Sequence, residues 1–162
     1  MKKVMKKDVT PYALAMYSRT MVAGWAEVDV NGHMRNTAYL DVSSDVRMLC
    51  FAAAGFPTGE FARLRFGPVV KRDELEYFRE LRLLDEFSVS LVVAGLSEDG
   101  SRFRLRNEFG AADGARVARV TSDGGWLDLE RRRLAPPPPE LAGILLSLPR
   151  TDDFEMLPGG GR

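Results

Sequence analysis

The sequence predicts an α+β domain in which a long antiparallel β-sheet wraps one central α-helix. Two observations carry this prediction. Residues 38–54 repeat apolar side chains at the spacing of a helix face and are apolar over much of the helix circumference. After Gly67, most segments instead alternate apolar and polar residues, as half-buried strands do. Because so apolar a helix must be covered, we expect the strands to enclose it.

A strand and a tight turn are predicted ahead of the helix. The strand covers residues 19–27. Its apolar face carries Met21, Ala23 and Trp25. The dipeptide Asn31-Gly32 then indicates a turn, because both residues tolerate positive φ angles. The chain therefore passes from a strand end through a turn into the helix.

The helix has a recognisable start and end. Asn36 or Thr37 is a suitable N-cap, since short polar side chains satisfy free N–H groups of the first turn. Gly55 followed by Pro57 predicts the C-terminal end. The helix should therefore hold roughly 18–20 residues and extend about 27–30 Å at 1.5 Å per residue.

Four strands are predicted after the helix, over residues 67–80, 87–95, 102–109 and 117–129. The first has the weakest pattern, because its charged centre also suits a helical turn. The last is expected to bend at residues 123–125, where glycines interrupt the strand.

Both ends of the chain are expected to lie outside the domain. Residues 1–17 form a lead-in, and residues 18–147 hold the domain, including a short docked helix near residues 140–147 after a proline run. Residues 148–162 are predicted to be a disordered tail, because the terminal glycines give no reason for order. A length of 162 residues suits one domain.

Composition argues against several classes of protein. Lys plus Arg equals Asp plus Glu at 23 each, so no net charge favours a nucleic-acid partner. The single cysteine, Cys50, cannot form an intrachain disulfide and is expected to be a small buried hydrophobe. With one histidine, a zinc site would need mostly carboxylates, so we expect neither a metal nor another cofactor.

Targeting signals are not expected either. The basic N-terminal residues lack the apolar stretch that follows them in a signal peptide. No apolar run is long enough to cross a bilayer, which takes about 20 residues. The sequence therefore predicts a cytoplasmic protein without a membrane partner.

The stretch from Trp25 to Leu40 brings reactive groups together. Asp29 stands in the turn, and the first N–H groups of the helix follow a few residues later. A carboxylate can attack a carbonyl group or activate water, while free N–H groups hold the oxygen that becomes negative. This stretch is therefore a candidate site for chemistry on a carbonyl. Asp before Asn-Gly is also common turn chemistry, so a purely structural role for Asp29 stays open.

The order of elements and this motif resemble the hotdog-fold acyl-CoA thioesterases of the 4-hydroxybenzoyl-CoA thioesterase type. The motif reads Trp25, Asp29, Asn31-Gly32-His33, Met34-Arg35-Asn36 and Tyr39-Leu40. The likeness extends over roughly residues 18–147 and implies hydrolysis of an acyl thioester carried by coenzyme A (CoA) or an acyl carrier protein. It also implies a homodimer or homotetramer, because the family builds its active sites between two protomers.

The resemblance assigns roles to individual residues. Asp29 matches the catalytic carboxylate, as nucleophile or general base. Asn36 matches the position whose backbone N–H binds the thioester oxygen. His33 and Tyr39 match positions that line the pocket, and Gly32 is taken as a substrate-binding position in the same motif.

Basic residues outside the motif have two interpretations. Arg131 and Arg132 can bind the phosphates of CoA through charge-assisted hydrogen bonds, as can Lys71 and Arg72. Charge runs are more often solvated surface, however.

Three other acids bear on the choice of Asp29 as the catalytic carboxylate. Glu27 is a departure, since many relatives have a second Asp at that position. Asp41 and Asp45 lie one helical turn apart, and a second branch of the fold uses a helix carboxylate as catalyst. Exposed or paired helix acids are the commoner case.

Two other functions are left open. A hotdog enoyl thioester hydratase or dehydratase also combines Asp and His, although those relatives have a longer interval, with Pro in it, than Asp29 to His33. A non-catalytic acyl-CoA-binding module can use the same fold without turnover.

Overall fold

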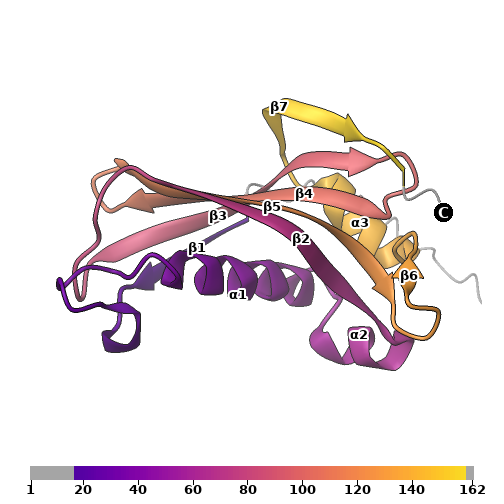
Figure 1. Ribbon diagram of the computed structural model, residues 1–162, viewed down its shortest axis with the longest axis horizontal. Coiled ribbons are helices and arrows are strands. Elements are labelled where there is room, and N and C mark those ends of the chain that lie inside the picture. Colours follow the sequence, from indigo (N-terminus) through magenta and orange to yellow (C-terminus); the bar gives the residue numbers. More distant parts are fainter. Residues whose placement is uncertain (1–16, 160–162) are drawn as a thin grey trace, which may run out of the picture.

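The computed structural model describes residues 17–159, and Figure 1 shows one long, curved sheet lying over a central helix. The sheet consists of β1 (Tyr17–Val22), β2 (Phe66–Tyr77), β3 (Glu86–Ser97), β4 (Arg102–Ala111) and β5 (Arg116–Asp128). These strands pair antiparallel in the spatial order β1-β3-β4-β5-β2. Two shorter additions are β6 (Arg133–Leu134) beside β5 and β7 (Arg150–Leu157), which runs parallel to β3. The predicted sheet around one helix is confirmed.

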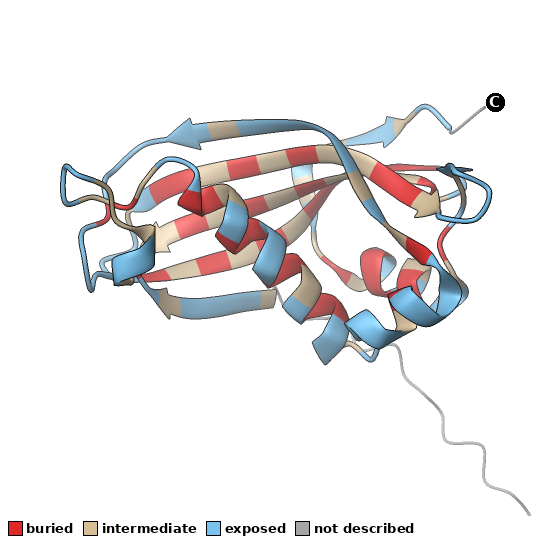
Figure 2. Cartoon of the chain, turned by 60° about the horizontal axis from the view of Figure 1, so that its bottom comes forward, coloured by how far each residue is buried: buried red, intermediate tan, exposed pale blue. Residues whose placement is uncertain are grey.

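The central helix, α1 (Ala38–Ala53), has nearly the predicted limits. It holds 16 residues, follows Thr37 at the N-cap position, and ends before Gly55, whose φ of 97° suits glycine. Figure 2 shows the buried residues of α1 on the side of the helix toward the sheet and the exposed residues on the opposite side. The chain then forms α2 (Thr58–Leu64), which the sequence analysis did not anticipate. The predicted docked helix is confirmed as α3 (Pro139–Ser147).

The core between α1 and the sheet forms two clusters. The cluster at the start of α1 contains Tyr39 and Phe109, whose ring centroids lie 5.2 Å apart. The cluster at the end of α1 contains Phe51 and Trp126, at 5.8 Å. Cys50 lies in this second cluster, and burial raises the pKa of its thiol to about 11, so it is the inert hydrophobe that the sequence predicts. The first cluster supports the segment that carries the candidate site.

The strand predicted over residues 19–27 is wrong in its second half. β1 ends at Val22, and Trp25–Glu27 form a 3₁₀ turn, η1. The cause is local: the Glu27 carboxylate accepts a 2.8 Å hydrogen bond from the backbone N–H of Gly24, which closes the turn. Trp25 therefore does not share a strand face with Met21, and its side chain is 84% exposed.

The predicted disorder after residue 147 is also wrong for the part that the structure describes. β1 pairs with only the first half of β3, so the edge of β3 from Val93 onward is free to pair with β7. Two arginines of β4 then bind the acids of β7, with Arg106 on Asp153 and Arg104 on Glu155. The pairing and these charge contacts order a segment that reads as polar in the sequence.

The four strands predicted after α1 are confirmed as β2 to β5. The expected bend in the last of them coincides with a register shift between Val70 and Arg72 of β2, opposite Gly124 and Asp123 of β5. None of the helices within residues 17–159 is long and apolar enough to cross a membrane. The predicted lead-in lies outside the described residues except for Tyr17, which begins β1.

Candidate active site

The turn between η1 and α1 holds the side chain of Asp29 in one orientation. Its Oδ1 accepts hydrogen bonds from the backbone N–H groups of Asn31 at 2.8 Å and His33 at 3.4 Å. Gly32, with a φ of 77°, donates its N–H to the Asp29 carbonyl at 3.0 Å. Within residues 17–159, Oδ2 accepts no hydrogen bond. One carboxylate oxygen thus stabilises the turn and the other is available for chemistry.

The start of α1 presents unpaired backbone donors. Thr37 makes no side-chain cap hydrogen bond, and its own N–H has no partner among the described residues, although turn carbonyls already accept the N–H groups of Ala38 and Leu40. The N–H of Asn36 has no hydrogen-bond partner among the described residues, while its carbonyl accepts a 2.9 Å hydrogen bond from the Tyr77 hydroxyl. The positive end of the helix dipole adds to the attraction for a negative oxygen here. This is the geometry of a site for a developing oxyanion.

These groups meet in one pocket of about 350 Å³ at the amino end of α1. It is lined by Asp29, His33, Met34, Asn36, Tyr39, Tyr77, Phe78, Arg79 and Glu80. Four of the residues that the sequence analysis singled out, Asp29, His33, Asn36 and Tyr39, therefore lie together. Asp29 is half-buried and borders this pocket.

His33 is fixed by a partner that the sequence analysis missed. Its Nε2 lies 3.0 Å from Oε2 of Glu80, in the segment after β2. This contact occupies the Nε2 side of the ring and leaves Nδ1 without a partner among residues 17–159. Nothing in the sequence spacing connects Glu80 with His33, because the two meet through pairing of residues 33–34 with residues 81–82.

Tyr39 and Tyr77 form the wall of the pocket nearest the core. Their ring centroids lie 5.4 Å apart in an edge-to-face arrangement. Burial, with smaller contributions from Tyr77 and Glu80, raises the pKa of Tyr39 to about 12. Tyr39 is therefore a neutral phenol near neutral pH.

The structure does not bring every candidate to this pocket within one chain. Gly32 shapes the turn but is not among the lining residues, and Glu27 binds back to Gly24. Arg131 and Arg132 lie in the hairpin between β5 and β6, at the opposite end of the sheet in Figure 1. Asp128 closes that hairpin by accepting the N–H of Arg131 at 2.9 Å.

The two helix acids of α1, Asp41 and Asp45, are surface acids and not part of the candidate site. Asp41 lies 3.4 Å from Nη2 of Arg35, and both Asp41 and Asp45 are exposed. Neither lines the pocket.

Comparison with solved structures identifies the architecture as the hotdog fold. A hypothetical protein from Staphylococcus aureus, solved in complex with CoA, is 22% identical with a TM-score of 0.74, over 83% of this chain and 87% of that chain. A 1,4-dihydroxy-2-naphthoyl-CoA thioesterase from Synechocystis is 15% identical with a TM-score of 0.73, over 82% of this chain and 96% of that chain. The fold thus defines the class as hotdog proteins.

The family follows from the sequence itself. Residues 23–145 match the family model of the thioesterase-like superfamily. The chain belongs to this superfamily and is a thioester hydrolase of the hotdog fold. A comparison with curated proteins finds no significant match.

Proposed function

We propose that this chain hydrolyses acyl-CoA thioesters with Asp29 as the catalytic carboxylate and the Asn36 N–H as the donor to the thioester oxygen. One observation carries the proposal: Asp29, with a free carboxylate oxygen, and Asn36, with an unpaired N–H, line the same pocket. The S. aureus protein was solved with CoA and the Synechocystis protein is a CoA thioesterase, which supports CoA as the carrier. An acyl carrier protein would present the same thioester and stays an alternative carrier.

The chemistry begins with attack on the thioester carbon. Asp29 Oδ2 either attacks directly, giving an acyl anhydride that water then cleaves, or takes a proton from a water molecule that attacks. In both cases the carbonyl electrons move to oxygen, and the Asn36 N–H with the amino end of α1 stabilises that charge. One such donor typically contributes about 3–4 kcal/mol of transition-state stabilisation. The thiolate leaves without needing a strong acid.

A second copy of the chain fits this proposal. β2 is the edge strand of the sheet within the described residues and carries one wall of the pocket. Its apolar residues Val70 and Tyr77, with the following Phe78, are about half exposed. Large apolar side chains beside an open edge suit contact with another protomer. We therefore propose a homodimer or homotetramer with the pocket completed across the contact.

Asp29 and His33 in one pocket also favour a second candidate, an enoyl thioester hydratase or dehydratase. In that reaction the pair would add or remove water across a carbon–carbon double bond. The free Nδ1 of His33 is the acceptor that such proton transfer requires.

Thiol release from a panel of acyl-CoA substrates tests the proposal. Asp29→Asn is the sharp variant, because the amide keeps an oxygen that can accept the N–H groups of Asn31 and His33. The turn should therefore survive while kcat falls about 10²–10⁴-fold, the usual contribution of a positioned base. Asp45→Asn makes the same charge change at an exposed position of α1 and should keep wild-type activity.

The outcomes separate the candidates. Thiol release by Asp29→Asn within a few-fold of the wild type would refute the role of Asp29. Hydration of an enoyl-CoA without thiol release would favour the hydratase. Binding of acyl-CoA by the wild type without any turnover would favour the binding module.

A further inference from the structure

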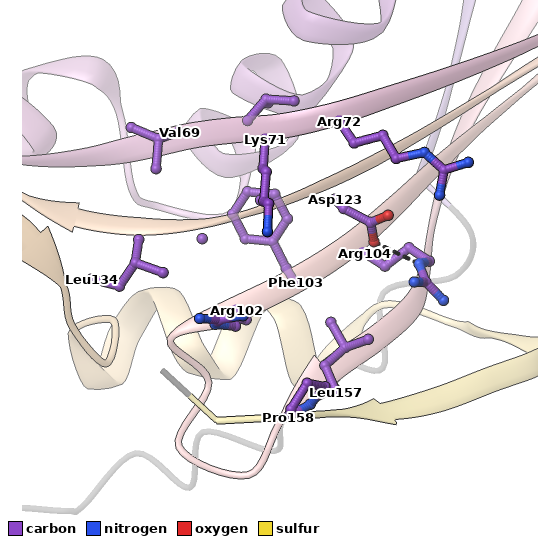
Figure 3. A pocket seen from close by; sticks show the side chains of 13 residues that line it. Val69, Lys71, Arg72, Arg102, Phe103, Arg104, Asp123, Leu134, Leu157 and Pro158 are labelled. Carbon is purple, nitrogen blue, oxygen red and sulfur yellow. Dashed lines mark hydrogen bonds and ion pairs between the residues drawn. The ribbon is translucent and has the colours of Figure 1, made fainter. Parts of the chain in front are cut away.

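A second pocket lies on the face of the sheet that points away from α1. Its volume is about 350 Å³, and it extends over β2, β4 and β5 (Figure 3). Arg102 and Arg104 contribute to it from β4 positions that alternate with the buried Phe103 and Leu105, and Asp123 contributes from the β5 position paired with Arg104. It shares no lining residue with the pocket of Asp29.

Backbone features create this pocket. Gly124 and Gly125 of β5 line it with backbone alone, and neither position tolerates a side chain. A Cβ on Gly124 would meet the Val69 carbonyl, and one on Gly125 would lie 2.6 Å from the Ser101 carbonyl. Opposite them, the register shift of β2 between Val70 and Arg72 falls at Lys71. The strand thus directs Lys71 into the hollow, where Figure 3 shows it extending from β2 toward the side of Arg102.

The charged part of the lining is mostly basic. Lys71, Arg72, Arg102 and Arg104 line the pocket with Asp123 as the single acid. Arg104 is already paired, at 2.6 Å to Asp123 and 2.9 Å to Glu155. Arg72 pairs at 2.8 Å with Glu74, a residue that does not line the pocket.

The other two basic residues have no acidic partner among residues 17–159. Neither Lys71 nor Arg102 takes part in an ion pair there. In addition, Nε of Arg102 is buried with no hydrogen-bond partner. A buried donor without an acceptor costs free energy, so an anion that accepts from it would be bound favourably.

We infer that this pocket binds the phosphate of a ligand that also carries an apolar or flat group. Lys71 and Arg102 supply charge-assisted donors to the phosphate oxygens. The apolar part is matched by the remaining lining side chains, which are Val69, Val70, Phe103, Leu134, Leu157 and Pro158. A nucleotide combines a phosphate with such a group.

Two sources offer this chemistry. One is the phosphorylated adenosine end of the CoA that carries the substrate, in which case the inference rests on the proposed function. The other is a free nucleotide. Binding of a free nucleotide would not depend on hydrolysis in the Asp29 pocket.

Binding is measured by calorimetry with adenosine 3′,5′-bisphosphate as the probe and adenosine as the comparator without phosphate. We expect the wild type to bind the bisphosphate at least about tenfold more tightly than adenosine, with an affinity that falls as salt rises. Lys71→Ala and Arg102→Gln should each weaken binding about tenfold or more. Arg63→Ala removes the same charge from the exposed, Glu60-paired side chain on α2 and should bind like the wild type.

The inference is overturned if the bisphosphate does not bind, or if it binds to both pocket variants as it does to the wild type. Kinetics then separate the sources. If the pocket holds CoA, both variants raise KM for acyl-CoA but not for an acyl N-acetylcysteamine thioester, which lacks phosphate. If KM is unchanged while bisphosphate binding is lost, the ligand is a free nucleotide. Absence of hydrolysis with either thioester would refute the proposed function but leave the binding result intact.

Discussion

Tyr77→Phe tests whether β2 holds the start of α1 in its reactive geometry. The Tyr77 hydroxyl donates a 2.9 Å hydrogen bond to the carbonyl of Asn36, the residue whose N–H faces the thioester oxygen in our proposal. Phenylalanine keeps the ring, which packs 5.4 Å from the Tyr39 ring, and removes this bond alone. Tyr77 is therefore tested as a positioning residue.

The expected losses of stability and of kcat are estimated separately. Losing a hydrogen bond at a half-exposed hydroxyl should cost about 0.5–1.5 kcal/mol of stability. For a domain of this size, each kcal/mol lowers Tm by about 2–4 °C. Complete loss of an oxyanion donor reduces kcat about 10²–10³-fold, so a donor that is displaced but present should reduce it by roughly tenfold. KM should change little, because the effect falls mainly on the transition state.

The assay is steady-state thiol release, paired with a thermal melt. Tyr17→Phe, which removes a hydroxyl on β1 outside the pocket, is the matched control and should keep the wild-type kcat. If Tyr77→Phe lowers Tm but leaves kcat unchanged, the bond to Asn36 is structural only. The link between β2 and the oxyanion donor would then be refuted.

Two other predictions concern stability. Arg47 of α1 is buried and donates from Nε to Asn107 Oδ1 at 2.9 Å. Asn107→Leu should therefore lower the free energy of unfolding, measured in urea, by about 1.5–3 kcal/mol. Adding Arg47→Met should recover most of this loss, and a double variant as unstable as the single one would contradict the reasoning. Arg106 donates to Asp153 at 2.9 and 3.0 Å and holds the pKa of that carboxyl well below its usual range. A lowered pKa stabilises the fold above the ordinary pKa of about 3.9 and loses that effect as pH falls toward the folded-state pKa. Asp153→Asn should therefore lower Tm slightly at neutral pH, by an amount that shrinks in acid; a constant difference down to about pH 2 would argue against the ion pair.

The elements that sequence reasoning predicted correctly are specified by neighbouring residues. The end of α1 follows from Gly55, and its buried face follows from the apolar spacing. Asp29 and Asn36 lie seven positions apart in the short connection between η1 and α1, so the sequence spacing already indicates that both lie near the amino end of α1. This part of the site can therefore be predicted from neighbouring residues in the sequence.

The features that sequence reasoning missed depend on distant parts of the chain. β7 is ordered by the open edge of β3 and by Arg104 and Arg106, some 50 residues earlier. Glu80 reaches His33 only because the chain after β2 pairs with the turn before α1. The error at Trp25 has the opposite origin, because a single local bond from Gly24 to Glu27 overrides an alternating pattern.

This difference between local and long-range contacts explains why a reaction can be proposed for the site but not a particular acyl group. Attack and oxyanion stabilisation need a carboxylate and backbone donors, which one turn and one helix start supply within a single chain. Recognition of the acyl group and its carrier needs side chains from β2, from the outer face of the sheet and, in our proposal, from a second protomer. Lys71 illustrates the point: the sequence shows only a basic pair, whereas a register shift and two glycines of another strand turn it into part of a pocket. Substitutions that change specificity should therefore concentrate around β2 and leave the Asp29 turn intact.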